Sequence, residues 1–184
     1  MDDISAAMTA IDRQGFLPAA DRDRAGYDGP LPIGHGQTNS QPRTVEDMLR
    51  LLDPRPGQRV LDVGSGSGWT TALLAHLVGT SGHVVGVELE PELVEFGGAN
   101  LAATGQPWAR IEQAGEVLGW PPDAPYDRVL VSADGGSLPD ELLDQLAAGG
   151  RMVLPVSGRM TLVVRDGERL VTSEHGAYSF VPLR

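Results

Sequence analysis

The sequence contains no cysteine and no lysine, and each absence excludes a kind of chemistry. Without cysteine there is no disulfide framework, no thiolate nucleophile and no thiolate zinc site. Without lysine there is no Schiff-base catalysis, and all 14 cationic side chains are arginines. Any catalysis must therefore use oxygen or nitrogen groups of other residue types.

Positive charge is also scarce: the 14 arginines are outnumbered by 25 acidic residues, and the formal net charge is −11. A negative field repels phosphate backbones, and the scattered arginines form no dense basic patch, so we expect no nucleic-acid partner. No apolar run approaches the roughly 20 residues that span a bilayer, and the acidic start lacks the basic character of a secretory signal. We therefore expect a cytoplasmic protein that does not bind membranes.

The length of 184 residues suits a single domain with one core. Apolar spacing predicts a short helix over residues 2–14, followed by an irregular arm over 16–32 that is rich in proline and glycine. The loop 30–42 is dense in hydroxyls and amides. Within it, Ser40 can cap the next helix, and Pro42 suits that helix's first turn.

The most informative stretch is 60–69, where a short apolar strand runs into three alternating glycines and then into a helix. Gly64, Gly66 and Gly68 leave no Cβ atoms in this turn, so a ligand can approach the backbone closely, and we expect outward amides after Gly66. A dinucleotide fingerprint needs G-x-G-x-x-G, but Trp69 stands where its third glycine belongs. The spacing therefore weakens an NAD interpretation.

Two acidic residues accompany the glycine turn. Asp62 lies two positions before the first glycine, and Glu88 ends the next apolar strand, about twenty residues past the turn, where nucleotide-binding folds keep a carboxylate for ribose hydroxyls. This arrangement resembles the first motif of Rossmann-like S-adenosylmethionine-dependent methyltransferases. The simpler alternatives are a glycine-rich loop that binds nothing and an exposed acid at a strand end.

The remaining pattern alternates strands and helices, which predicts a three-layer α/β/α sandwich with a mostly parallel, seven-stranded sheet. Expected helices begin at Pro42, Pro91 and Pro139, the last running to Leu146 and stopped by the glycines at 149 and 150. Later strands are expected over 108–113, 126–132 and 152–156, then in a hairpin of 160–165 and 169–172, and finally over 178–182.

Several segments together resemble the family of protein-L-isoaspartate O-methyltransferases, from near Phe16 to the end of the chain. The main one is Gly34-His35-Gly36-Gln37-Thr38-Asn39-Ser40-Gln41-Pro42, which is similar to the family's active-site signature with its GQT-x-S core. The others are Pro91–Phe96, Ala124–Asp127, Leu142–Leu146, Gly149–Arg151 and Phe180–Leu183.

The resemblance implies one domain over 1–184, in which 1–42 carry the N-terminal helix, arm and active-site loop and 43–184 carry the cofactor-binding fold. It implies methyl transfer from S-adenosyl-L-methionine to the α-carboxylate of L-isoaspartyl residues in damaged proteins or peptides, by a protein that we expect to be monomeric. Ser40 would hold the acceptor carboxylate, with Thr38 and Gln37 beside it. The residues expected to contact the cofactor are Asp62, Gly64, Ser65, Gly66, Gly68, Glu88, Leu89 and Glu116.

Two departures from the family pattern leave alternatives open. The family usually has an aspartate that touches the adenine amino group where this chain has Gly115, so Glu116 or Gln113 would have to replace that contact. Asp134 stands in a segment that is small and alanine-rich in the family, where it would repel an anionic acceptor or read a substrate cation. The alternatives are an aspartyl-peptide or small-molecule carboxylate acceptor, and a non-catalytic domain that binds a nucleoside or a protein.

Overall fold

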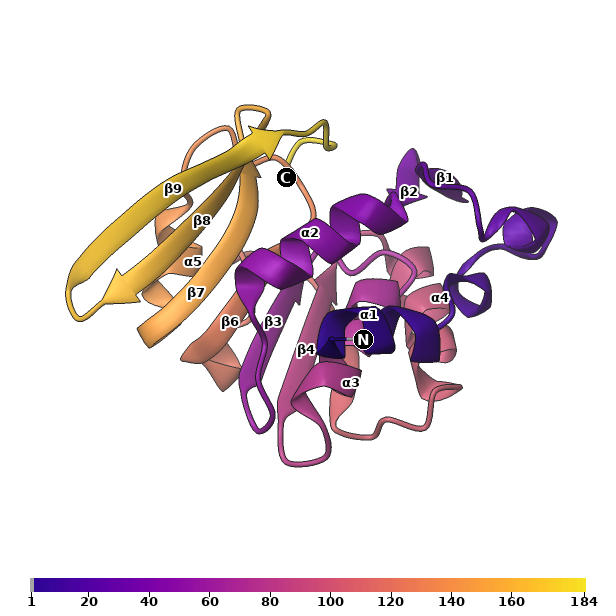
Figure 1. The fold of residues 1–184 in the computed structure, drawn as a ribbon, viewed down its shortest axis with the longest axis horizontal. Coiled ribbons are helices and arrows are strands. Elements are labelled where there is room, and N and C mark those ends of the chain that lie inside the picture. Colours follow the sequence, from indigo (N-terminus) through magenta and orange to yellow (C-terminus); the bar gives the residue numbers. More distant parts are fainter. Residues whose placement is uncertain (1) are drawn as a thin grey trace.

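A seven-stranded sheet forms the centre of the computed structural model, which describes residues 2–184 (Figure 1). In spatial order its strands are β5 (Ala109–Gln113), β4 (His83–Glu88), β3 (Arg59–Val63), β6 (Tyr126–Val131), β7 (Leu146–Val156), β8 (Arg159–Asp166) and β9 (Arg169–Ala177). The first five run parallel, β8 runs antiparallel to β7, and β9 runs antiparallel to β8. The predicted fold class is confirmed.

Helices cover the two faces of the sheet unequally. Those packed on one face are α1 (Asp3–Ala10), α2 (Pro42–Leu52), α3 (Trp69–Val78) and α4 (Pro91–Ala102). The other face carries α5 (Asp140–Asp144) and the loop 114–125. Figure 1 shows α1 and α2 in front of the sheet and α5 behind it. Within residues 2–184, no helix is both long and apolar enough to cross a membrane.

Strand alternation decides which side chains meet which layer. In β3, Val60 belongs to the core beneath α1, α2 and α3, whereas Leu61 and Val63 belong to the core beneath α5. Asp62 therefore points to the same face as Val60, toward α3, and is fully buried there.

The N-terminal part differs from the expected single helix and irregular arm. Helix α1 ends at Ala10, and the chain continues through two short 3-10 helices, Arg13–Phe16 and Ala19–Arg24. The polar loop then contains a two-stranded hairpin, β1 (Leu31–Gly34) and β2 (Gln37–Asn39). The hairpin turn uses Gly34 and Gly36 at φ of 94° and 71°, which glycine adopts without strain.

The expected N-cap role of Ser40 is wrong. Helix α2 begins at Pro42, its N-cap residue is Gln41, whose side chain makes no capping bond, and the first-turn N–H of Arg43 donates to the Asp28 Oδ1 at 3.1 Å instead. Proline at the first position lowers the need for a capping side chain, because it has no backbone N–H to satisfy. The Ser40 hydroxyl is therefore not committed to starting α2.

The C-terminal part corrects two further boundaries. Helix α5 ends at Asp144, and β7 already begins at Leu146, so the glycines at 149 and 150 lie inside a strand instead of ending a helix. Residues 178–182 are not a strand. They cross the carboxyl end of the sheet and form one isolated bridge, between Pro182 and Asp134.

Asp134 fastens this crossing segment to the sheet. Its backbone N–H donates to the carbonyl of Val181 and its carbonyl accepts from the N–H of Leu183, both at 2.8 Å. Its carboxylate accepts three backbone N–H groups, from Gly136 at 2.8 Å and from the β7–β8 turn, Ser157 and Gly158, at 2.9 and 2.7 Å. These bonds lower the pKa of Asp134, because they stabilise its charged form.

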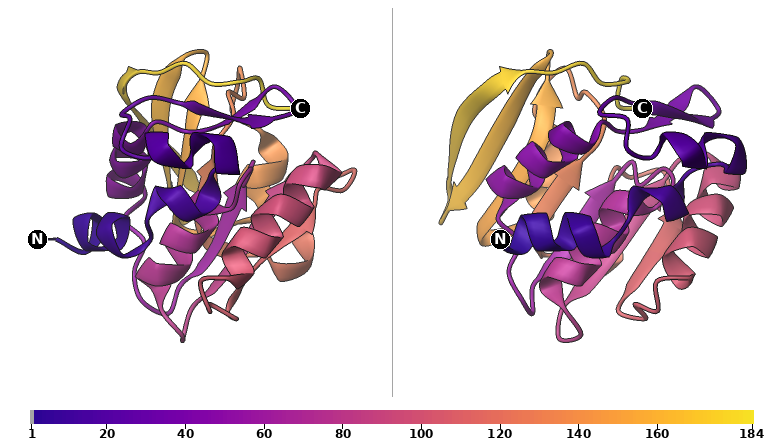
Figure 2. Two further views of the ribbon diagram at one scale, coloured as in Figure 1. Left: turned by 90° about the vertical axis from the view of Figure 1, so that its right-hand side faces the viewer. Right: turned by 45° about the vertical axis from the view of Figure 1, so that its right-hand side comes forward.

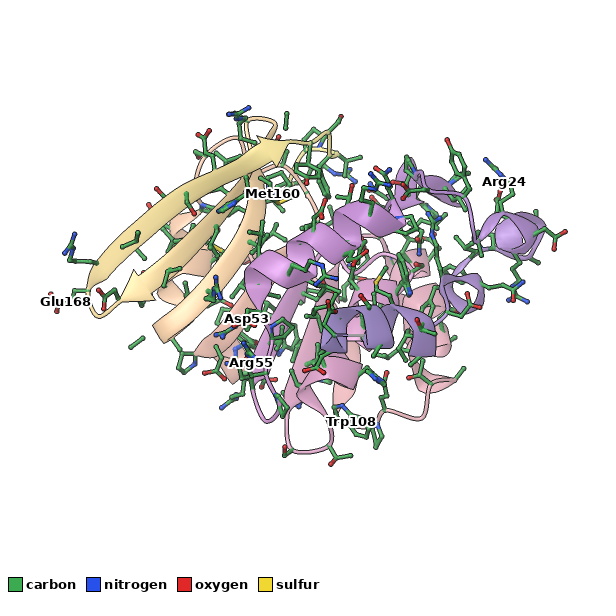
Figure 3. The ribbon with its side chains drawn as sticks, in the orientation of Figure 1. Arg24, Asp53, Arg55, Trp108, Met160 and Glu168 are labelled. Atoms are coloured by element: carbon green, nitrogen blue, oxygen red, sulfur yellow. The ribbon has the colours of Figure 1, made fainter. Side chains whose placement is uncertain are left out.

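Replacing Asp134 by alanine should lower the free energy of unfolding by about 2 kcal/mol, because three backbone donors lose a charged acceptor. Asp134→Asn keeps one acceptor oxygen and should lose less. Urea denaturation measures both. The control is Glu168→Ala, which removes an acid from the outer tip of the β8–β9 turn (Figure 3). Equal stability of the Asp134→Ala and Glu168→Ala variants would contradict this role.

Candidate active site

A cavity of about 1160 Å³ lies at the carboxyl ends of the parallel strands. Its walls come from segments far apart in the sequence: 37–41, 43–44 with Asp47, 63–67, 69–70, 87–89, 114–119, 132–133 with Gly135, and 177–184. In both views of Figure 2 the β1–β2 hairpin and the C-terminal segment lie at the same, upper end of the sheet. This is where ligands bind in open parallel sheets.

The glycine turn between β3 and α3 is packed tightly against α4. Gly64, Gly66 and Gly68 all have positive φ, at 79°, 50° and 85°. A Cβ at Gly68 would meet the Gly97 carbonyl oxygen at 2.7 Å, and a Cβ at Gly97 would meet the Gly66 carbonyl oxygen at 2.6 Å. No side chain fits at Gly68 or Gly97, so the backbones of the turn and of α4 lie in direct contact.

Glu88 ties the end of β4 to this turn. One carboxylate oxygen, Oε2, accepts the Gly66 N–H at 2.9 Å, and Oε1 accepts the N–H groups of Leu89 and Glu90 at 2.7 and 3.0 Å. The N–H of Gly68 donates to the Ser65 carbonyl at 2.8 Å. The expectation of outward amides after Gly66 is therefore wrong for Gly68, whose N–H is used inside the turn, and the Gly66 N–H is also taken, by Glu88.

Asp62 lies behind the turn and does not line the cavity. Its Oδ2 accepts the hydroxyls of Thr70 and Thr71, each at 2.7 Å, while Oδ1 has no hydrogen-bond partner among the described residues. Burial raises its pKa to about 6; the two threonine bonds oppose the shift, and the charge of Glu88 adds to it. Asp62 thus acts on the cavity through the start of α3.

Ser65 supplies the observation that best fits a bound ligand. Its side chain is 4% exposed, it lines the cavity, and its Oγ has no hydrogen-bond partner in the described part of the chain. Buried hydroxyls are normally satisfied, and an orphaned one in a cavity wall indicates a missing partner. A polar ligand atom beside the turn would provide that partner.

The cavity is open beside Gly115, in the loop after β5. A Cβ added at Gly115 would meet no atom within 4 Å. The amide nitrogen of Gln113 donates to the carbonyls of Glu88 and Leu89 at 3.3 and 2.6 Å, so it is turned away from a ligand. Leu89, exposed by 42%, and Glu116 both line the cavity here.

The opposite wall is formed by the end of the hairpin. Thr38 and Ser40 line the cavity. Asn39, between them, donates from Nδ2 to the Ser67 Oγ at 2.9 Å, which links this wall to the glycine turn. At the neighbouring edge the C-terminal segment is held on α2, because the Tyr178 hydroxyl donates to Asp47 at 2.9 Å.

The structure thus gathers most of the expected site residues in one place. Those lining the cavity are Thr38, Ser40, Gly64, Ser65, Gly66, Glu88, Leu89 and Glu116. Asp62 and Gly68 support the turn from behind. Sequence reasoning missed Asn39, the 177–184 wall and the buried Arg13; the similarity at Phe180–Leu183 was the one signal for the second of these.

One possible metal-ligand group lies outside the cavity. His35, Glu90 and Glu92 offer ligand atoms within 4.8 Å of one another. Glu90, however, accepts a bond from Arg184 at 2.9 Å, and the other two side chains are exposed. Nothing further points to a cation there.

The strand order, the glycine turn and the cavity at the carboxyl ends define a Rossmann-like methyltransferase fold. The sequence model of the family described as "Protein-L-isoaspartate(D-aspartate) O-methyltransferase" matches residues 1–184. The chain therefore belongs to this family, and the resemblance noted from the sequence is confirmed.

Individual relatives agree with this assignment. A protein-L-isoaspartate O-methyltransferase of Methanopyrus kandleri is 46% identical over 187 residues, covering 98% of this chain and 82% of the relative. One from Rhodopseudomonas palustris is 46% identical over 186 residues, with 98% and 75% covered. A Plasmodium falciparum protein described as the same enzyme, in complex with S-adenosyl-L-homocysteine, matches the structure with a TM-score of 0.89 at 25% identity, covering 100% and 91%.

The raised pKa of Asp62 predicts a pH-dependent stability. The folded protein keeps the proton of this carboxyl up to about pH 6, whereas the unfolded chain releases it near 3.8. The contribution of Asp62 to stability is therefore complete below about pH 4 and is lost as the pH rises through 6. The free energy of unfolding of Asp62→Asn, measured relative to wild type, should therefore rise by up to about 3 kcal/mol between pH 4 and 7.5. Urea denaturation at both pH values measures this difference; a constant difference would contradict it.

Proposed function

We propose that this chain transfers a methyl group from S-adenosyl-L-methionine to the α-carboxylate of L-isoaspartyl residues in damaged proteins or peptides. The observation that carries the proposal is that one cavity has the glycine turn with Glu88 on one wall and the Thr38–Ser40 segment on another. Membership of the isoaspartate methyltransferase family supports the same reaction.

The reaction asks little proton chemistry of the protein. The acceptor carboxylate is already ionised at pH 7 and attacks as it stands, so no strong base is needed. S-adenosyl-L-methionine, when bound, would supply a methyl group already activated by its sulfonium, with the neutral thioether as the leaving group. The chain must hold the acceptor in line and exclude water, which in favourable cases contributes roughly 7 to 11 kcal/mol. The ester product can then cyclise to a succinimide, which reopens partly to normal aspartate.

On the cofactor side, we assign the ribose contact to Glu88. Its Oε1 already accepts two backbone donors, whereas Oε2 accepts one and can accept a hydroxyl as well. Ser65 Oγ is free to bind a polar atom of the amino-acid part. Leu89 would pack on the adenine. Glu116 would accept a hydrogen bond from the adenine amino group, in place of the aspartate that the family usually has where this chain has Gly115.

On the acceptor side, we assign the substrate contact to Ser40, with Thr38 beside it. Since Ser40 does not cap α2, its hydroxyl can donate to the isoaspartyl carboxylate. The carboxylate of Asp134, by contrast, accepts three backbone N–H groups. Asp134 therefore gives no reason to propose an acceptor other than the isoaspartyl carboxylate.

The proposal includes a monomeric protein that works in the cytoplasm. Light scattering after size-exclusion chromatography and cell fractionation test these two statements.

Purified protein should methylate an isoaspartyl peptide in the presence of labelled S-adenosylmethionine and leave the matched aspartyl peptide unlabelled. Calorimetry should show binding of S-adenosylhomocysteine. Labelling of only the normal aspartyl peptide would overturn the repair reaction, and absence of any heat would favour a non-catalytic domain.

Ser40→Ala should raise the KM for the isoaspartyl peptide about tenfold, because one hydrogen bond to a charged group is lost. The affinity for S-adenosylhomocysteine should stay within a factor of two. The control is Ser81→Ala, in the exposed turn between α3 and β4. A Ser40→Ala variant with the parental KM would remove the assigned substrate contact.

A further inference from the structure

Arg13 is a buried arginine directly behind the acceptor wall. Its side chain is 4% exposed, and its guanidinium holds two segments of the arm and hairpin together. Nε donates to the Asn39 Oδ1 at 2.7 Å, and Nη1 donates to the Tyr27 carbonyl at 2.8 Å. Nη2 donates to the carbonyls of Gly29, Asn39 and Ser40 at 2.8, 3.0 and 3.0 Å.

The positive charge of Arg13 has no ion-pair partner among residues 2–184. Asp28 is the one carboxylate that raises its pKa, and Asp28 is itself paired with Arg43 at 3.4 Å. Its hydrogen-bond acceptors are backbone carbonyls and the Asn39 amide oxygen, and the centroid of the Trp69 ring lies 5.7 Å from the guanidinium carbon. Arg13 also lines a second, smaller cavity together with Asp12, Asp28 and Glu46, none of which is within ion-pair distance of it. Burial lowers the pKa of Arg13 to about 10, so the side chain is still cationic at pH 7.

This cation lies one peptide group from the proposed acceptor contact. Its Nη2 is bonded to the carbonyl of Ser40, and Asn39 connects it to Ser67 in the glycine turn. Ser40, Asn39, Ser67 and Trp69 all line the cavity. A buried charge without a counter-ion is weakly screened, and the field it produces extends into that cavity.

We infer that Arg13 is a positioning and specificity residue, which holds the Ser40 segment and whose positive charge favours an anionic acceptor over a neutral one. The inference rests on the proposed function, because it assigns the acceptor to the Ser40 wall. We expect this charge to change the binding of a carboxylate acceptor by about tenfold.

Asn39→Asp tests the charge while keeping the scaffold. The new carboxylate can accept from Arg13 as the amide oxygen does, and the Ser67 hydroxyl can donate to its second oxygen. The variant should unfold at no lower urea concentration than wild type. Its kcat/KM for the isoaspartyl peptide should fall about tenfold, mainly through KM, with the affinity for S-adenosylhomocysteine changed less than threefold.

The matched control is Arg24→Gln, which makes the same change of net charge at the outer end of the arm (Figure 3). Arg24 is exposed and paired with Asp21, so solvent screens it. Its kcat/KM should stay within twofold of wild type. A control that loses as much as Asn39→Asp would overturn the local charge effect.

A binding measurement separates charge from structure and needs no turnover. Calorimetry on the S-adenosylhomocysteine complex compares the isoaspartyl peptide with the same peptide carrying an α-carboxamide. Wild type should prefer the carboxylate about tenfold, and Asn39→Asp should lose the preference. Equal weakening of both peptides, or a wild type without preference, would overturn the inference.

Arg13→Lys provides the second variant. It keeps the charge but cannot make the same set of bonds, so it should lower stability and still retain the carboxylate preference within threefold. Loss of that preference with the charge in place would contradict the charge effect. A wild type that prefers the carboxylate but methylates no isoaspartyl peptide would contradict only the proposed reaction.

Discussion

The structure depends on the direct backbone contact between the glycine turn and helix α4. Because Gly68 and Gly97 have no Cβ, the backbone of the turn can lie in contact with α4, and Glu88 accepts the Gly66 N–H from the end of β4. Any side chain at these positions would push α4 away and separate Glu88 from the turn. This contact therefore positions the cavity wall that carries Ser65, whose hydroxyl has no hydrogen-bond partner among the described residues.

The opposite wall is stabilised by different means, since it belongs to no sheet of the core. A two-stranded hairpin alone is marginally stable in water. Here Arg13 binds its carbonyls from behind, and Trp69 donates from its ring nitrogen to the Ile11 carbonyl at 2.9 Å. The arm, the hairpin and the start of α3 are thus joined through polar contacts, so the acceptor wall and the cofactor wall are positioned relative to one another.

Local pattern predicted the sheet and the turn well, because β3, β4 and β6 are nearly continuous apolar runs and the glycine spacing has a direct steric meaning. It failed where distant segments decide the outcome. The role of Asp134 depends on amides 23 and 24 residues further on, and the hydrogen bonds of Arg13 reach acceptors up to 27 residues away. No spacing rule links such positions, so Arg13 was indistinguishable from a solvated arginine of the arm.

The net negative charge of the protein repels a carboxylate acceptor at long range, and the burial of Arg13 offsets this repulsion at the site. The exposed carboxylates that give the net charge of −11 act through water and salt, and beyond about 8 to 10 Å their effect is largely screened. Many are also neutralised locally, as Glu46 is by Arg50 at 2.6 Å. A single buried cation close to the acceptor outweighs them at the site, because its field passes through protein instead of solvent. The charge that matters for this reaction is therefore the one that solvent does not reach.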